Sequence, residues 1–275
     1  MDRLTEQGYW ETVMSSSGEG RFYRLLSRWL GAKTATMLTS YADFQLWQSI
    51  YPDCLPRGEK LKALEVGSAP GHFLVGLHRN REYDVYGLEY TESGAQTNRR
   101  VFAEAGLNPE HVVQADFFEP GFQEQYQGYF DLVFSRGFIE HFEDVSSVLD
   151  SHLNLLKPGG HLVISIPRLR SLNWLIQSFF DPSNIKLHNI KIMEMERFRE
   201  LFADKPLTEV VCRYFGTFNL GLFGAPSKSW KAGLLKLTRG LQMVLNGLFF
   251  ALLGVRGFEN RFTSPYLLYI GRKAD

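Results

Sequence analysis

The fold is decided by one stretch of the chain, Leu64-Glu65-Val66-Gly67-Ser68-Ala69-Pro70-Gly71-His72-Phe73-Leu74. A short apolar run passes directly into small residues and then into a helical pattern, which predicts a strand, a tight loop and a helix. Gly67, Ala69 and Gly71 carry little or no side chain, so a ligand can lie against the main chain of the loop, and both glycines permit a positive φ. In an open α/β sheet such a loop lies at the crevice beside the carboxyl ends of the strands. We therefore expect a bound cofactor there.

Short apolar runs alternate with amphipathic stretches on both sides of this loop, from about residue 61 to residue 167. The runs at 61–66, 83–88, 111–115, 130–134 and 161–166 predict strands, and the stretches at 72–80, 92–105 and 145–156 predict helices. Strands that alternate with crossover helices can pair only as a parallel sheet with helices on both faces. The predicted fold class is therefore α/β, with a doubly wound core.

We expect one domain over residues 1–275, with the cofactor-binding core at 61–167. Residues 1–60 predict an N-terminal helical cap with helices at 22–30 and 34–50, the second ending near Pro52 because proline cannot continue a helix. Residues 168–275 form the acceptor-side region. It carries a stretch of large apolar side chains at 172–180, a predicted helix at 193–203, strand-like runs at 210–215 and 266–270, and a helical insertion within 216–262.

Composition excludes several classes of protein. The 275 residues are 44% apolar, and 30 basic side chains balance 30 acidic ones, so no overall charge would hold the chain on nucleic acid. Cys54 and Cys212 have neither disulfide-framework nor zinc-site spacing, and we expect no metal. The polar start of the sequence does not resemble a secretory signal, which predicts a cytoplasmic protein.

Three carboxylates follow successive predicted strands and identify the kind of cofactor. Glu65 stands just before the loop, Glu89 ends the second strand, and Asp116 follows the third. A carboxylate at the second position can take both hydroxyls of a ribose, and one at the third can accept a proton from an exocyclic amine such as that of adenine. A dinucleotide loop would have glycine at Ala69 and again at His72, so a pyrophosphate is disfavoured. The acids suit an adenosine that carries positive charge.

With these residues in view, the sequence resembles the class I S-adenosylmethionine-dependent methyltransferases of the small-molecule type. The resemblance rests on Glu65-Val66-Gly67-Ser68-Ala69-Pro70-Gly71, Glu89, Ala115-Asp116-Phe117, Phe130-Asp131-Leu132-Val133-Phe134-Ser135-Arg136-Gly137-Phe138-Ile139-Glu140-His141-Phe142 and Leu155-Leu156-Lys157-Pro158-Gly159-Gly160-His161-Leu162. It implies a mostly parallel seven-stranded sheet with an added helical cover, and S-adenosyl-L-methionine as cofactor. Lys157-Pro158-Gly159-Gly160 would be the turn before the fifth strand.

The resemblance also implies roles for individual residues. Gly67, Ser68, Ala69 and Gly71 would line the methionine part of the cofactor, although alanine stands at position 69 where this family often has glycine. The other implied contacts are Glu89 with the ribose, Asp116 and the Phe117 backbone with adenine, Tyr90 as a cover over adenine or ribose, and Ser135 and Arg136 with the amino-acid end. From its own position, at the start of the helix that follows the glycine loop, His72 could touch the carboxylate of the cofactor.

Methyl transfer from a sulfonium is a direct displacement, so the protein must chiefly align and desolvate the reactants. A base is needed only if the acceptor atom must lose a proton, as a hydroxyl oxygen does. His141, expected to open the helix after the fourth strand, and His188, in the expected acceptor wall, are the candidates. Each could instead have a purely structural role. The other histidines at 78, 111, 152 and 161 are expected at the surface or at strand edges.

The acceptor-side region is rich in large apolar side chains, which favours a small-molecule or lipid-linked acceptor. Within residues 231–256 an apolar run lies between basic residues; it is too short to span a bilayer but could lie at a membrane surface, be buried, or form a dimer. Gly8-Tyr9-Trp10-Glu11 resembles an aromatic segment that closes over the cofactor, or it is a hydrophobic staple for the N-terminal helix. Two other functions stay open: a non-catalytic cofactor-binding sensor or scaffold, and a nicotinamide-dependent oxidoreductase.

Overall fold

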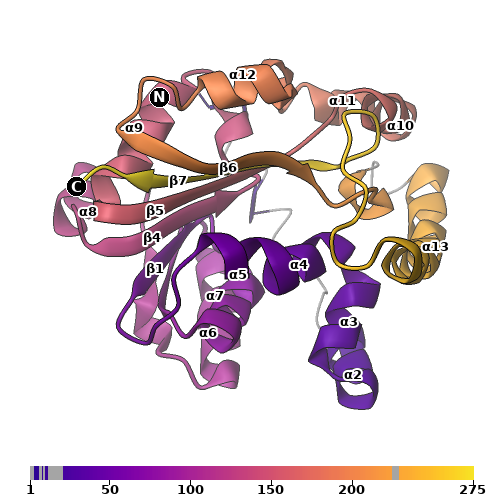
Figure 1. Ribbon diagram of the computed structural model, residues 1–275, viewed down its shortest axis with the longest axis horizontal. Coiled ribbons are helices and arrows are strands. Elements are labelled where there is room, and N and C mark those ends of the chain that lie inside the picture. Colours follow the sequence, from indigo (N-terminus) through magenta and orange to yellow (C-terminus); the bar gives the residue numbers. More distant parts are fainter. Residues whose placement is uncertain (1–2, 6–7, 9, 12–20, 225–228) are drawn as a thin grey trace.

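A computed structural model describes residues 3–5, 8, 10–11, 21–224 and 229–275. Its centre is a seven-stranded sheet in the order β3-β2-β1-β4-β5-β7-β6 (Figure 1). The strands are β1 (Lys62–Val66), β2 (Asp84–Glu89), β3 (Val112–Gln114), β4 (Phe130–Arg136), β5 (Leu156–Pro167), β6 (Leu207–Phe215) and β7 (Tyr266–Lys273). The first five strands pair in parallel, and β7 pairs antiparallel with both β5 and β6. The predicted doubly wound, mostly parallel sheet is confirmed.

Helices cover both faces of this sheet (Figure 1). On one face lie α6 (His72–Arg81) and α7 (Glu92–Ala105), the two crossovers between the first three strands. On the other lie α8 (Pro120–Gln125), α9 (Val145–Leu155) and α12 (Met195–Glu200). Each face has its own buried apolar cluster, because the strands carry large apolar side chains on both sides.

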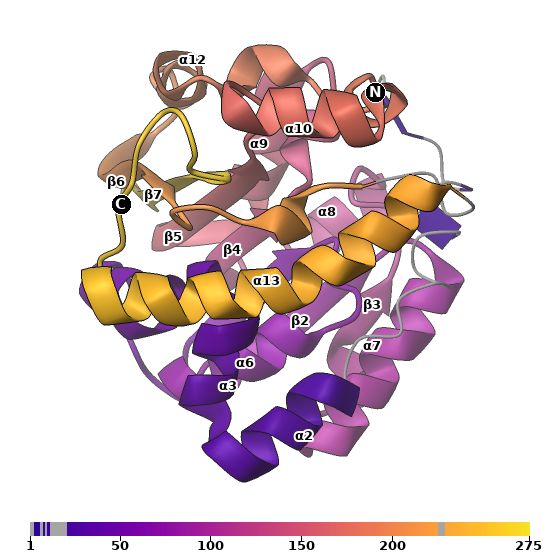
Figure 2. The ribbon, with the colours of Figure 1, turned by 90° about the vertical axis from the view of Figure 1, so that its right-hand side faces the viewer.

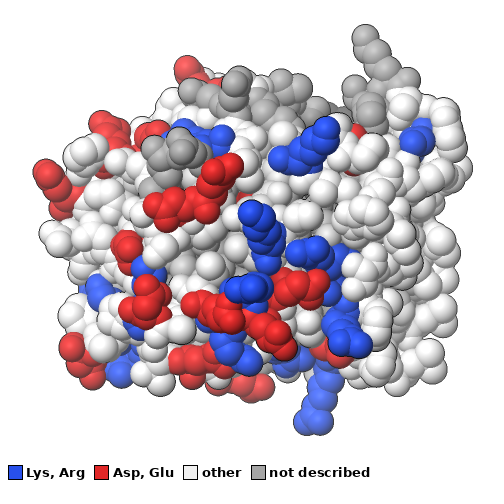
Figure 3. Space-filling view, turned by 90° about the horizontal axis from the view of Figure 1, so that it is seen from above, with Lys and Arg blue, Asp and Glu red and all other residues white. Residues whose placement is uncertain are grey.

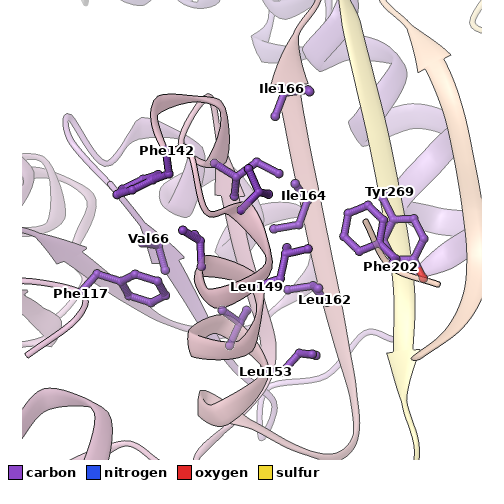
Figure 4. Packing of buried hydrophobic residues seen from close by; sticks show 14 of the residues in the cluster. Val66, Phe117, Phe142, Leu149, Leu153, Leu162, Ile164, Ile166, Phe202 and Tyr269 are labelled. Atoms are coloured by element: carbon purple, nitrogen blue, oxygen red, sulfur yellow. The ribbon is translucent and has the colours of Figure 1, made fainter. Parts of the chain in front are cut away.

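The cluster under α9 shows how the second face is held (Figure 4). Leu149 and Leu153 of α9 point toward Leu162 and Ile164 of β5. At the antiparallel end, the ring of Phe202 stacks on Tyr269 of β7 with a centroid separation of 3.6 Å and an interplanar angle of 3°. Burial of such side chains is the main source of stability in a domain of this size.

The N-terminal helices differ from the prediction. The chain forms α2 (Arg21–Leu30), α3 (Ala32–Thr39), α4 (Tyr41–Gln45), a π-helical turn η1 (Leu46–Ile50) and α5 (Tyr51–Cys54). The predicted continuous helix at 34–50 is wrong, because Ser40 is extended and its hydroxyl caps α4 by accepting from the amide of Asp43. The predicted stop at Pro52 is also wrong. This proline lies in the first turn of α5, where a missing N–H costs little.

Two elements near the end of the core also differ. β5 begins at Leu156 and includes Lys157-Pro158-Gly159-Gly160, which the resemblance implied would be a turn. The ladder is irregular there, since Leu156 pairs with Phe130 while His161 pairs with Leu132. The predicted helix at 193–203 is shorter, divided into a 3₁₀ turn η4 (Ile190–Met193) and α12.

The acceptor-side region adds α10 (Leu172–Phe180), α11 (Pro182–Ile185), a 3₁₀ turn η5 (Leu220–Leu222) and the long helix α13 (Trp230–Leu253). In Figure 1 the arrow of β7 points left, so the parallel strands end on the right, and α13 crosses that side of the molecule (Figures 1 and 2). Of the helices that the structure describes, none combines the length and the apolar character that crossing a bilayer requires.

We expect Leu149→Ala to lower the free energy of unfolding by about 2–5 kcal/mol, because Leu149 is fully buried and its loss leaves a cavity between α9 and the sheet. Leu175→Ala on α10 is the matched control; its side chain is exposed, so the change should stay within about 0.5 kcal/mol. Urea unfolding measures both. Equal losses would contradict the packing described here.

Candidate functional site

A cavity of about 180 Å³ opens at the carboxyl ends of β1, β2, β3 and β4. Eight of the predicted site residues line it: Gly67, Ala69, Glu89, Tyr90, Asp116, Phe117, Arg136 and His141. The sequence missed other lining residues, which include Arg3, Thr5, Phe118, Gly137, Phe138 and Phe142. Residues distant in the sequence therefore meet where the topology predicted a crevice.

The loop after β1 is held by its backbone and by one asparagine. The amides of Gly67 and Ser68 both donate to the carbonyl of Leu88 at 3.0 Å. Gly71 has a φ of +93°, and a Cβ there would lie 2.0 Å from Oδ1 of Asn98, so no larger residue fits. Asn98 in turn donates to the Ser68 hydroxyl at 2.6 Å. Ser68 and Gly71 shape the loop and do not line the cavity.

The carboxylate of Glu89 joins the end of β2 to this loop. It accepts hydrogen bonds from the amide and hydroxyl of Thr91, at 3.0 and 2.7 Å, and from the amide of Ala69 at 3.3 Å. The side chain is buried and still borders the cavity. Its position is fixed before any ligand arrives, which lowers the entropic cost of binding.

Asp116 already holds a partner. Arg3 donates to both carboxylate oxygens of Asp116 at 2.6 and 2.5 Å. The Arg3 guanidinium also lies 5.2 Å from the ring centre of Tyr90 and 5.5 Å from that of Phe118. A planar group between two aromatic rings, bonded to a carboxylate, thus occupies the place where the resemblance implied adenine. Arg3 had no motif in the sequence to mark it.

Glu65 is buried beneath the cavity and does not line it. Burial raises the pKa of its carboxyl to about 8, and the nearby Arg136 opposes this only in part. Its Oε2 has no hydrogen-bond partner among the described residues. Arg136 does reach the cavity; it pairs with Asp43 at 2.8 Å and lies 3.8 Å from the ring centre of Phe73.

The two candidate catalytic histidines lie side by side, with ring centroids 4.7 Å apart. Burial lowers the pKa of His141 to about 3 and also lowers that of His188, so both rings are neutral at pH 7. His141 does not open a helix as predicted; it ends the 3₁₀ turn η3 (Ile139–His141), because α9 begins only at Val145. His188 lies outside the cavity lining.

The structure also places His72, Ser135 and His152, which the sequence analysis had singled out. His72 is exposed and lies outside the cavity lining. Ser135 is buried and contacts Nε2 of His152 at 3.2 Å, away from the lining. The prediction that His152 lies at the surface is wrong. It is fully buried on the inner face of α9, as its helical spacing from Leu149 would have shown.

The described N-terminal residues close one side of the cavity. The amide of Leu4 donates to the carbonyl of His141 at 2.8 Å, and the ring of Trp10 meets that of His141 edge-on at 5.0 Å. Trp10 also donates to the Thr5 hydroxyl at 3.0 Å. The predicted closing aromatic segment is therefore represented by Trp10, whereas Tyr9 lies outside the described residues.

Comparison with known proteins gives a consistent result. A sequence profile described as a methyltransferase domain matches residues 40–209, which is more than half of the chain. The ubiquinone biosynthesis O-methyltransferase of Pectobacterium atrosepticum is 27% identical over 115 residues, which cover 42% of this chain and 46% of that protein. The matched stretch thus spans less than half of the length of this relative.

Two solved structures share the fold. Geranyl diphosphate C-methyltransferase from Streptomyces coelicolor A3(2), crystallised with Mg²⁺, geranyl diphosphate and S-adenosyl-L-homocysteine, has a TM-score of 0.57 at 14% identity and covers 96% of this chain and 88% of its own. A SAM-dependent methyltransferase from Archaeoglobus fulgidus has a TM-score of 0.52 at 18% identity and covers 92% and 100%.

We expect the buried carboxyl of Glu65 to make folding pH-dependent. The folded chain keeps this proton up to about pH 8, whereas the unfolded chain releases it near the ordinary pKa of 4.5, so stability falls as pH rises through this window. One such group changes the free energy of unfolding by at most about 1.4 kcal/mol per pH unit. Glu65→Gln should therefore gain roughly 2–3 kcal/mol over the wild type between about pH 5.5 and 7.5 in urea unfolding.

Glu124→Gln provides the control, because Glu124 is exposed on α8. Its stability difference from the wild type should be the same at both pH values. A Glu65→Gln difference that does not change with pH would show that Glu65 ionises normally in the folded chain.

Proposed function

Because this chain belongs to the class I S-adenosylmethionine-dependent methyltransferases, we propose that it methylates an oxygen atom of a small, apolar or lipid-linked acceptor. The family sets aside the nicotinamide-dependent oxidoreductase. The observation that carries the proposal is the cavity itself, in which carboxylates from two strand ends, a side-chain-poor loop and an apolar wall meet. The side of the cavity with Glu89 and Asp116 suits the methyl donor, and the side with Phe138 and Phe142 is mainly aromatic.

The residues present fit S-adenosyl-L-methionine. Asp116 offers acceptor oxygens for the adenine amine between Tyr90 and Phe118, and Glu89 offers its carboxylate to the ribose hydroxyls. At the methionine end, Arg136, which lines the cavity, would pair with the carboxylate. These placements support binding of a ligand with adenosine at one end and an amino acid at the other.

When bound, S-adenosylmethionine supplies a methyl group on positively charged sulfur. The chain must then hold the acceptor oxygen in line and keep water away. Phe117, Phe138 and Phe142 form an apolar wall of the cavity, which suits an apolar acceptor. His141 reaches this wall and His188 lies behind it. Both neutral rings carry a lone pair that can receive the acceptor's proton or a cation.

Support for oxygen as the methylated atom comes from the name of the relative, an O-methyltransferase of ubiquinone biosynthesis. Ubiquinone is an apolar molecule, which agrees with the aromatic wall of the cavity. The match covers less than half of that protein, so the acceptor itself is part of our proposal.

We also propose that α13 docks the enzyme on a membrane. On this helix polar side chains face the protein and apolar side chains face outward. Gln242 and Asn246 are buried, at 6% and 1% exposure, whereas Leu237 and Leu252 are 76% and 79% exposed. Asn246 donates to the carbonyl of Leu38, and Gln242 bonds to Leu220 and Phe218. Exposed apolar residues recur along one stripe at 237, 241, 244, 248 and 252, which is helical spacing.

The stripe continues onto neighbouring elements. At its start, Lys231 donates to the carbonyl of Phe179 on α10, where Trp174, Leu175 and Phe179 are also exposed. Neither α10 nor α13 contains an acidic residue. In Figure 3 acidic and basic side chains gather over the middle and left, whereas the right-hand margin, on the side of α13, is largely uncharged.

Basic side chains flank this apolar surface and can bind the headgroups of anionic lipids. Lys33, Lys236 and Arg256 are exposed beside it, with no carboxylate on the helices that carry the stripe. Exposed apolar residues bordered by cations bind the interface of an anionic bilayer. Helix α13 lies on the side where the parallel strands end (Figure 2), and the cavity also opens at the ends of β1 to β4, so docking through α13 would bring this side of the enzyme toward the lipid. A lipid-linked acceptor could then enter without crossing water.

We expect Asp116→Ala and Glu89→Ala each to weaken binding of S-adenosyl-L-methionine or S-adenosyl-L-homocysteine at least tenfold, because each removes hydrogen bonds to the nucleoside. Arg3→Ala should act in the opposite direction and strengthen binding several-fold, since Arg3 competes for Asp116. Isothermal titration calorimetry measures all three, with Glu124→Ala as the surface control.

The same proteins, given the labelled methyl donor and a prenylated phenol, test the acceptor side. Label recovered on the phenol oxygen, lost in Asp116→Ala and kept in Glu124→Ala, is the expected result. No heat with either ligand would overturn the donor site. Transfer to carbon or nitrogen alone would overturn the assignment of oxygen.

We expect the protein to sediment with vesicles that contain anionic phospholipid, and Leu237→Glu with Leu248→Glu to reduce the bound fraction by roughly fivefold or more, since both changes put charge into the apolar stripe. Gln96→Glu with Gln125→Glu adds the same charge to other exposed helices and should leave binding unchanged. Binding to neutral vesicles should be weaker. A dimer in solution that the stripe variant disrupts, without vesicle binding, would assign the stripe to a second copy.

A further inference from the structure

Glu140, His141 and His188 form a compact group beside the cavity. Each offers one ligand atom, and these atoms lie within 4.8 Å of one another. Nε2 of His141 lies 3.7 Å from Oε1 of Glu140. Two imidazoles and one carboxylate at such distances need only a small contraction to bind one ion at bond lengths of about 2.0–2.2 Å.

The two histidines are held through Nδ1, which leaves the lone pair of each Nε2 available. Nδ1 of His141 lies 2.8 Å from the carbonyl of Leu187, and Nδ1 of His188 lies 2.8 Å from the carbonyl of Asn184. A carbonyl oxygen can only accept, so each Nδ1 carries the proton and each Nε2 keeps its lone pair. Backbone carbonyls bonded to Nδ1 are the usual support of histidines that bind metal through Nε2.

The segment that carries His188 is fastened to the segment that carries the other two residues. The amide of Asn189 donates to the carbonyl of Glu140 at 2.6 Å, and its side chain donates to the carbonyl of Phe142 at 3.2 Å. With the bond from His141 to Leu187, three contacts join two stretches far apart in the sequence. The geometry of the group is therefore set by the fold.

The carboxylate of Glu140 is the strongest indication that this group binds a cation. Glu140 is 1% exposed, and neither Oε1 nor Oε2 has a hydrogen-bond partner among the described residues. A buried carboxyl without partners costs several kcal/mol unless a cation or a donor satisfies it. Its free oxygens lie beside the free lone pair of His141.

We propose that Glu140, His141 and His188 bind one divalent transition-metal ion at the edge of the cavity. Two imidazoles favour zinc, iron, cobalt or nickel over magnesium and calcium, which prefer oxygen ligands. Three protein ligands leave at least one coordination position open. The sequence predicted no metal, because metal binding was judged from the cysteine spacing alone. His188 is also distant from Glu140 in the chain, so no local motif marks the group.

A role for this ion rests on the proposed function. His141 lines the cavity, so the open position can face the acceptor. A hydroxyl oxygen that completes the coordination has a lowered pKa and releases its proton to solvent water, after which the oxygen forms its bond to the methyl carbon as the carbon–sulfur bond breaks. The histidine lone pairs then hold the ion and do not accept the proton.

Titration of the chelator-treated full chain with Co²⁺ and Zn²⁺ tests the site directly. We expect one ion per chain with a Kd below about 1 μM, visible absorption for Co²⁺, and a loss of affinity of at least tenfold in His188→Ala and in Glu140→Gln. His78→Ala removes an exposed histidine elsewhere and should bind as the wild type does. Circular dichroism checks that each variant is folded. If Glu140→Gln does not fold, the test rests on His188→Ala, because His188 is less buried.

Absence of stoichiometric binding, or binding that His188→Ala leaves unchanged, would overturn the metal site. Calorimetry with S-adenosyl-L-homocysteine on the same samples separates this result from the proposed function. Heat with that ligand but none with the metals removes the metal site alone. Metal binding without heat from the nucleoside keeps the metal site and removes the donor assignment.

Discussion

The site depends on how the chain leaves β1. Gly67 and Ser68 donate to the carbonyl of Leu88 on the neighbouring strand, and the chain then turns through Gly71, whose missing side chain makes room for Asn98. If the loop stood farther from β2, the amide of Ala69 would not reach Glu89. The same few backbone contacts therefore position the loop, the ribose-side carboxylate and the floor of the cavity.

Around this loop the chain buries carboxyl groups whose oxygens are not fully hydrogen-bonded. Among the described residues, one oxygen of Glu65 and both oxygens of Glu140 have no hydrogen-bond partner, whereas the partly exposed Asp116 accepts from Arg3 and from the amide of Phe118. Such groups lower the stability of the chain without its ligands, because burial without a partner opposes ionisation. Natural proteins keep this arrangement where ligands complete it. The unpaired groups are therefore better evidence of function than the paired ones.

Sequence reasoning gave the parallel core because strand and helix periods alternate clearly between residues 61 and 167, and it gave Glu89 and Asp116 because strand ends converge in such a sheet. The predictions were wrong where contacts between distant segments determine where a helix or strand begins and ends. The cap of Ser40 divides a helix that periodicity joins, and an irregular ladder draws Lys157-Pro158-Gly159-Gly160 into β5. The pairing of Arg3 with Asp116 and of His141 with His188 follows from no local pattern, since each joins segments far apart in the chain.

Helix α13 has its hydrogen-bonding side chains turned inward, with Asn246 anchored on the carbonyl of Leu38. Lifting it from the protein would expose these amides, so the helix can meet lipid without leaving its place. An enzyme held in this way diffuses in two dimensions. Its turnover would then follow the mole fraction of acceptor in the bilayer and not the acceptor concentration in the bulk solution.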